Sequence, residues 1–315
     1  MNEPTELEKR ILKTIIYFDL FNYPMTSWEV WKWLINESGK PSSQVEFHEV
    51  LETLQQSQYL KNKIKIKNNF YFLNQHDRLA DERMEKYVIA WQKFRKVRRI
   101  VKILKLIPFI KMVAVCNDLA YFNAPADSDI DLFIITAKKR IWITRFLAVF
   151  IIKLLGLRPT ERNKKDKICL SIFVNEDKLN LEYLKINPDD IHFIYWLENL
   201  IPIYDADGYY QRLREANAWI NNFIPQAFPY EPNLRQKVSE GKLIKIIKNI
   251  FSFLTLDFDE NFYRWFQNKK FSPKIQEMMN KDTRVVVNDQ ILKFHTNDNR
   301  EDLSLKFKQK CEELI

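Results

Sequence analysis

The segment Ser128-Asp129-Ile130-Asp131-Leu132-Phe133-Ile134-Ile135 joins two carboxylates to an apolar run. The apolar run predicts a buried β-strand, and the carboxylates stand where that strand begins. Because successive side chains of a strand alternate between its faces, we expect Asp129 and Asp131 to project to the same side, about 7 Å apart. Two carboxylates in this arrangement offer the oxygen ligands that Mg²⁺ prefers, and such ions bridge substrate phosphates. The segment therefore predicts a site for one or two Mg²⁺ ions.

A second predicted strand precedes this segment. Pro108 ends a long helical pattern, and residues 110–116 (IKMVAVC) form a short apolar run that is typical of a buried strand. The stretch from Cys116 to Asp131 reads CNDLAYFNAPADSDID. This order of strand, short helix and Asp-x-Asp strand resembles the DNA polymerase β-like nucleotidyltransferase superfamily, especially its small prokaryotic members, over roughly residues 90–210.

The resemblance implies an α+β fold in which helices flank a mixed nucleotidyltransferase-type sheet. It implies Mg²⁺-dependent transfer of a nucleoside monophosphate from a nucleoside triphosphate to a hydroxyl or phosphate of an unidentified acceptor. Asp129 and Asp131 are then the catalytic residues and the metal ligands. The candidates for binding the nucleoside triphosphate are Asn117, Asp118, Ser128, Lys138, Arg140 and Arg145.

The basic members of that group lie at the start of the helix predicted after the second strand. Cations near a helix N-terminus oppose the helix dipole, which favours a phosphate-binding role for Lys138, Arg140 and Arg145. A solvated helix start is the alternative interpretation.

Two positions of the short helix depart from the superfamily pattern. Asn117-Asp118 stands where the superfamily has Gly-Ser, and Phe122 replaces a second glycine. We expect Asn117 to cap the short helix and to tolerate a left-handed backbone. A carboxylate at Asp118, about 5 Å from a phosphate charge, costs on the order of 3 kcal/mol at an effective dielectric of about 20.

The third departure concerns a carboxylate that the superfamily places on a later strand. That strand is predicted at residues 168–174 (ICLSIFV), which hold Ser171 and no acid. Asp166, Glu176 and Asp177 only flank it. The alternative function is therefore a catalytically impaired nucleotidyltransferase fold that acts as a nucleic-acid-binding or protein-binding module.

The first 75 residues predict a module of their own. Helical spacing over residues 7–18 and the capping boxes Thr26-x-x-Glu29 and Ser43-x-x-Glu46 indicate three helices, and residues 60–73 alternate around Asn68-Asn69 as in a β-hairpin. Three helices followed by a hairpin resemble the winged-helix fold. The third helix exposes glutamates, which oppose DNA phosphates, whereas the wing carries Lys61, Lys63, Lys65 and Lys67. A solvated hairpin face in a partner-binding module is the alternative to nucleic-acid binding.

The remaining patterns complete the domain organisation. We expect a winged-helix-like module at 1–75, a linker helix at 76–108, a nucleotidyltransferase-like core at 109–208 and a helical C-terminal region at 209–315. Asn187-Pro188 predicts a helix start, and residues 284–294 alternate weakly as in a hairpin. The linker helix carries seven cations and no acid over residues 93–105, which predicts either a nucleic-acid contact or a solvated face.

Composition excludes several classes of protein. The four glycines lie too far apart for a Walker A loop or a dinucleotide-binding turn, and the three cysteines form neither a disulfide framework nor a C-x-x-C zinc motif. The formal net charge of +9 favours anionic partners. Residues 141–157 are the most apolar stretch, but they are short and carry Arg145 and Lys153, so we expect a buried helix, with membrane-surface association as the alternative and no membrane span. These features predict a cytoplasmic protein.

Overall fold

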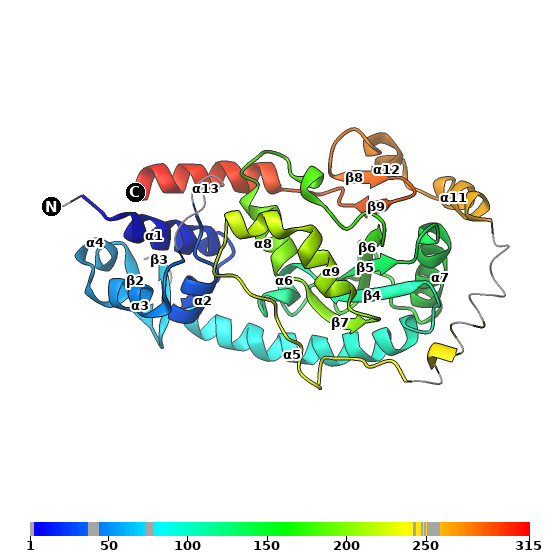
Figure 1. Ribbon diagram of the computed structural model, residues 1–315, viewed down its shortest axis with the longest axis horizontal. Coiled ribbons are helices and arrows are strands. Elements are labelled where there is room, and N and C mark those ends of the chain that lie inside the picture. The colour runs from blue at the N-terminus through cyan, green and yellow to red at the C-terminus, as the bar shows by residue number, and fades with distance from the viewer. Residues whose placement is uncertain are drawn as a thin grey trace.

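The computed structural model describes residues 3–36, 44–73, 78–241, 244–246, 248, 250 and 259–315. They form an α+β structure with two sheets (Figure 1). A three-stranded sheet has the order β1-β3-β2, and a mixed six-stranded sheet has the order β7-β4-β5-β6-β9-β8. The expected α+β class with a mixed sheet is therefore confirmed.

The N-terminal region has the three helices and the hairpin that its sequence predicts, and a fourth short helix, at Gln58–Lys61, that was not predicted. Its helices are α1 (Glu6–Asp19), α2 (Ser27–Lys32), α3 (Phe47–Gln56) and α4 (Gln58–Lys61), and its hairpin is β2 (Ile64–Lys67) with β3 (Phe70–Leu73). The capping box of Thr26 with Glu29 is present, whereas Ser43 lies outside the described residues. A two-residue strand, β1 (Met25–Thr26), pairs with β3 and was not predicted.

The predicted strand order of the core is also observed. After the long helix α5 (Leu79–Leu104) come β4 (Ile110–Val115), α6 (Asn117–Ala120), β5 (Ile130–Thr136), α7 (Ile141–Leu154) and β6 (Ile168–Asn175). Strand β5 is the middle of this group, antiparallel to β4 and parallel to β6. In Figure 1, α5 runs along the length of the molecule and connects the N-terminal region to the sheet.

The region after β6 corrects one prediction. A short 3-10 helix (Glu182–Leu184) precedes α8 (Ile191–Glu198), which begins at Ile191 rather than after Asn187, because the Asp190 side chain caps it by accepting from the backbone N–H of Phe193. Pro202 lies within strand β7 (Ile201–Asp205). Strand β7 is at the edge of the sheet, where the missing N–H of a proline is tolerated. Helix α9 (Tyr209–Ala216) and a second 3-10 helix (Ala218–Asn222) follow.

The C-terminal region supplies strands as well as helices. Helices α11 (Glu260–Asn268) and α12 (Pro273–Met278) precede the predicted hairpin, β8 (Val285–Val287) with β9 (Ile291–Phe294). Strand β9 pairs with β6, so this hairpin completes the sheet of the core. Helix α13 (Arg300–Leu314) then returns to the N-terminal region beside α1, where Lys310 Nζ lies 2.8 Å from Asp19 Oδ2 (Figure 1).

The two faces of the six-stranded sheet pack against different helices. Phe133 and Ile135 belong to the cluster that includes α1 and α8, whereas Leu132 and Ile134 belong to the cluster that includes α5 and α7. Asp131 has the same parity on β5 as Phe133. Strand alternation therefore directs Asp131 to the face that α1 and α8 cover.

Candidate functional site

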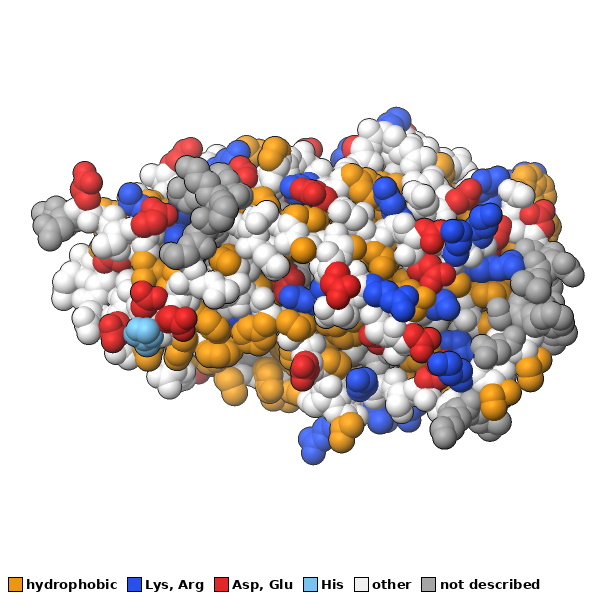
Figure 2. Space-filling model, in the orientation of Figure 1, with side chains coloured by type: hydrophobic (Ala, Val, Ile, Leu, Met, Phe, Trp, Pro, Cys, Tyr) orange, Lys and Arg blue, Asp and Glu red, His pale blue; other side chains and the backbone are white. Residues whose placement is uncertain are grey.

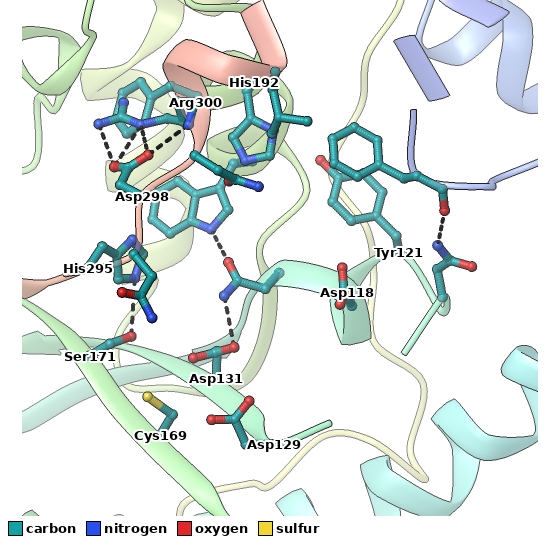
Figure 3. A pocket seen from close by; sticks show the side chains of 18 of the residues that line it. Asp118, Tyr121, Asp129, Asp131, Cys169, Ser171, His192, His295, Asp298 and Arg300 are labelled. Carbon is teal, nitrogen blue, oxygen red and sulfur yellow. Dashed lines mark hydrogen bonds and ion pairs between the residues drawn. The ribbon is translucent and has the colours of Figure 1, made fainter. Parts of the chain in front are cut away.

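A cavity of about 530 Å³ opens on that face of the sheet. Its walls come from the C-terminal end of α1, from α6 and α8, from the N-terminal ends of β5 and β6, and from the segment that joins β9 to α13. Figure 3 shows the carboxylates and the thiol at one end and a group of histidine, aspartate and arginine side chains at the other. Segments far apart in the sequence thus build one site.

Asp129 and Asp131 lie together, as predicted, and Cys169 joins them. One carboxylate oxygen of each aspartate and the Cys169 sulfur lie within 4.8 Å of one another. Asp131 and Cys169 are register partners in the parallel pair of β5 and β6. Cys169 was not predicted as a site residue, because only the strand register places its thiol beside the two acids.

Asn117 orients the Asp131 carboxylate. Its Nδ2 donates to Asp131 Oδ2 (2.8 Å), and its Oδ1 accepts from Trp196 Nε1 of α8 (2.7 Å). The predicted left-handed backbone is confirmed by a φ of 56°. The predicted cap is wrong, because the side chain makes these two contacts and no capping hydrogen bond.

Phe122, at the position of the second superfamily glycine, also has a left-handed backbone, with a φ of 55°. A bulky residue rarely adopts this conformation. Here its ring packs between Tyr87, Trp91 and Phe94 of α5, with the Tyr87 ring centroid 5.4 Å away. Phe122 therefore combines a left-handed backbone with aromatic packing of its ring against α5.

Burial and mutual repulsion perturb the acids of this site. Burial, followed by the charge of Asp129, raises the pKa of Asp131 to about 6. Burial also raises the pKa of Asp118, which lines the same cavity. Both shifts disfavour the ionised form, so these acids gain from a bound cation.

The acids that flank β6 do not complete the site. Asp166 binds Lys93 and Lys96, Asp177 pairs with Lys138, and Glu176 accepts from the backbone N–H of Lys138. In place of a third carboxylate, β6 presents Cys169 and Ser171 to the cavity. The absence of an acid from this strand was predicted.

The other end of the cavity is a polar cluster that the sequence analysis missed. Ser171 Oγ lies 3.3 Å from His295 Nε2, and the Tyr17 hydroxyl lies 3.1 Å from His192 Nδ1. Arg300 bonds both Asp298 and Asp190, the cap of α8. No sequence spacing indicates this cluster, because it forms only when β9 pairs with β6.

The predicted phosphate-binding cations do not reach the cavity. Lys138 and Arg140 follow the opposite end of β5, and Lys138 Nζ lies 3.0 Å from Asp177 Oδ2. Arg145 is buried, donates to Gln267 Oε1 (2.6 Å) and lies over the Phe294 ring, and burial lowers its pKa to about 9. The Ser128 hydroxyl donates to the carbonyl of Pro125. Of the predicted nucleotide-binding group, Asn117 and Asp118 alone line the cavity.

The basic residues of α5 do not form one exposed track. Lys93 is buried and donates to the Ser128 carbonyl (2.6 Å), Lys96 pairs with Asp166, and Lys105 donates to the Ser239 carbonyl (2.8 Å). Arg95, Arg99 and Lys102 remain exposed. On the face in Figure 2, basic side chains are interspersed with acidic ones.

Two of the lysines of the β2–β3 hairpin also bind other residues of the chain. Lys67 pairs with Asp81 (3.0 Å), and Lys63 donates to the Leu314 carbonyl.

Helix α7 buries part of its surface, as expected, but leaves Phe150 and Leu154 exposed. Within the described ranges, no helix has both the length and the apolar character needed to cross a membrane.

Comparison of the chain with protein-family models, with curated proteins and with solved structures finds no match.

Proposed function

We propose that the protein transfers a nucleoside monophosphate from a nucleoside triphosphate to an acceptor, with a divalent cation held by Asp129 and Asp131. The observation that carries this proposal is the convergence of the two carboxylates, with a third ligand atom within 4.8 Å, on the wall of a 530 Å³ cavity. A cavity of this size suits a small-molecule substrate. The resemblance of residues 116–131 to the nucleotidyltransferase motif supports the reaction class.

The donor chemistry of the site fits a divalent cation. Asp129 and Asp131 supply carboxylate oxygens, the ligands of Mg²⁺, and no Lys or Arg of the described part of the chain pairs with either acid. A bound cation neutralises charge on transferring phosphates and polarises the phosphoryl oxygen. Asn117 holds the Asp131 carboxylate through the 2.8 Å hydrogen bond, so the site is preorganised.

Aromatic side chains provide a surface for a nucleobase. Phe21, Tyr121 and Trp196 line the cavity that the acids share. Stacking of a base on such rings contributes about 1–3 kcal/mol and is tolerant of base identity. These features support a nucleotide as the ligand.

The test is isothermal calorimetry with each of the four nucleoside triphosphates, in Mg²⁺, in Mn²⁺ and in Zn²⁺, followed by an assay for metal-dependent pyrophosphate release. We expect Asp131→Asn to abolish release with little change in the thermal unfolding temperature, because the variant removes a buried charge and keeps the shape of the side chain.

Asp127→Asn is the matched control, since Asp127 is exposed in the loop before β5. It should retain the wild-type activity. Activity of Asp131→Asn equal to wild type overturns the assignment of this acid. Absence of nucleotide binding with all three metals overturns the enzyme proposal and favours the binding module.

A further inference from the structure

The third ligand atom of the acidic cluster is a sulfur, and this bears on the identity of the metal. Cys169 lies opposite Asp131 in the register of β5 and β6, and Asp129 lies two positions before Asp131 on the same face. The three ligand atoms lie within 4.8 Å of one another. In a tetrahedral zinc site with bonds of about 2.0–2.3 Å, ligand atoms lie roughly 3.3–3.7 Å apart, so side-chain rotation that brings the three atoms about 1 Å closer closes the site.

We propose that Asp129, Asp131 and Cys169 bind a borderline-soft divalent ion such as Zn²⁺ in preference to Mg²⁺, with the Cys169 sulfur as the third ligand. The inference rests on the cation site of the proposed function and names its metal. Mg²⁺ takes hard oxygen ligands, whereas a thiolate selects zinc and related transition metals. Three protein ligands leave one position open for a substrate oxygen, as in catalytic zinc sites.

A second observation, independent of the three ligand atoms, points to a missing cation. Asp129 and Asp131 form no ion pair with any Lys or Arg among the described residues, although both face the same cavity. Adjacent carboxylates without a counter-charge are unfavourable in a partly buried site. The nearest cations of the cavity wall, Lys293 and Arg300, are already paired with Asp298.

The surroundings of the cluster are those of a built metal site. Ligating carboxylates are held by hydrogen bonds from outer side chains in such sites. Asp131 accepts from Asn117, and Asn117 accepts in turn from Trp196. The Cys169 side chain lies beside Asp131, its register partner in the parallel pair of β5 and β6. On metal binding its S–H bond breaks, the proton passes to the buffer and the sulfur–metal bond forms without electron transfer.

Titration of the full chain with Co²⁺ as the probe tests the inference. A thiolate ligand gives an intense near-ultraviolet charge-transfer band, whereas oxygen ligands give only weak visible bands. We expect the wild type to show the intense band and Cys169→Ser to lose it. Zn²⁺ affinity, measured by competition with Co²⁺, should fall at least about tenfold in Cys169→Ser, with Mg²⁺ affinity little changed.

Cys311→Ser is the matched control, since Cys311 lies on α13 outside the cavity lining, and it should keep the band. If Cys169→Ser fails to fold, Cys169→Ala takes its place, and the loss of the band in that variant identifies the thiolate. Co²⁺ binding by the wild type without the intense band overturns the thiolate inference and leaves the acidic cation site standing. Equal Co²⁺ binding by wild type and Asp131→Asn overturns the cation site itself, and with it both proposals.

Discussion

Asn117 shows how one residue sets both the backbone and the chemistry of the site. Its φ of 56° places it in the left-handed region, and its amide joins Trp196 to Asp131. Both Asn117→Gly and Asn117→Ala remove the amide, but only alanine strains the left-handed backbone, by about 1 kcal/mol. We therefore expect Asn117→Ala to be less stable than Asn117→Gly by about that amount in urea unfolding. Equal stabilities of the two variants would contradict the role given to the backbone.

At the residue scale, the sequence predicts what depends on local alternation. Asp129 and Asp131 share a face because strand side chains alternate, and an asparagine adopts a left-handed backbone more readily than most residues. The roles of Cys169 and His295 in the cavity were not predicted, because the positions of these residues depend on which strands pair and in what register. The cations at 138, 140 and 145 were misplaced for a related reason, since they follow the far end of β5.

At the scale of elements, one buried ion-pair cluster attaches α13 to the core. Arg300, at the start of α13, lies 2.7 Å from Asp190 Oδ2 and 3.0 Å from Asp298 Oδ2, and all three side chains are buried. Asp190 is also the N-cap of α8. Arg300 therefore pairs both with Asp190, which caps α8, and with Asp298, which lies just before α13.

We expect Arg300→Met to lower the free energy of unfolding by about 3–5 kcal/mol, because the buried Asp190 carboxylate loses its ion-pair partner and Asp298 keeps only Lys293. Arg284→Met is the control, since Arg284 pairs with Asp282 at the surface and should contribute little. Urea unfolding of both variants measures the difference. A loss in Arg300→Met no larger than that in Arg284→Met would show that the cluster does not stabilise the attachment.

Elements with strong local signals were predicted, and elements defined by distant partners were not. The capping box of α2 and the Asn68-Asn69 turn are encoded within a few residues, and both are observed. Strand β7 contains Pro202, a residue that is rare in strands, and it forms by pairing with β4. Its local sequence therefore did not predict a strand. The pairing of β9 with β6 joins residues more than a hundred positions apart, for which the sequence carries no local signal.

At the scale of the whole molecule, the cavity lies where three regions of the chain meet. Tyr17 comes from the N-terminal region, His192 from the core, and His295 from the C-terminal segment. The Tyr17 hydroxyl contacts His192, and His295 contacts Ser171. The stability of this junction therefore depends on two half-buried imidazoles.

Burial lowers the pKa of His192 to about 4, with Arg300 and Lys293 opposing and Asp190 and Asp298 favouring the charged ring. In the unfolded chain the pKa is about 6.5, so the unfolded state binds the proton first as the pH falls. The neutral ring thus contributes stability above pH 6.5 that is lost progressively as the pH falls towards 4, up to roughly 3 kcal/mol of the free energy of unfolding. Asp131 has a raised pKa in the folded protein, so its contribution to the free energy of unfolding increases as the pH falls, opposite to that of His192.

Comparing His192→Gln with wild type isolates the histidine, because Asp131 is present in both proteins. We expect the variant to lose less of its free energy of unfolding between pH 6.5 and pH 4 than the wild type does, as measured by urea unfolding at several pH values. His48→Gln, which replaces an exposed histidine of α3, is the control and should follow the wild type. Parallel pH profiles for wild type and His192→Gln would mean that this ring is solvated, and that the meeting of α1, α8 and the C-terminal segment is looser than the packing around Tyr17 indicates.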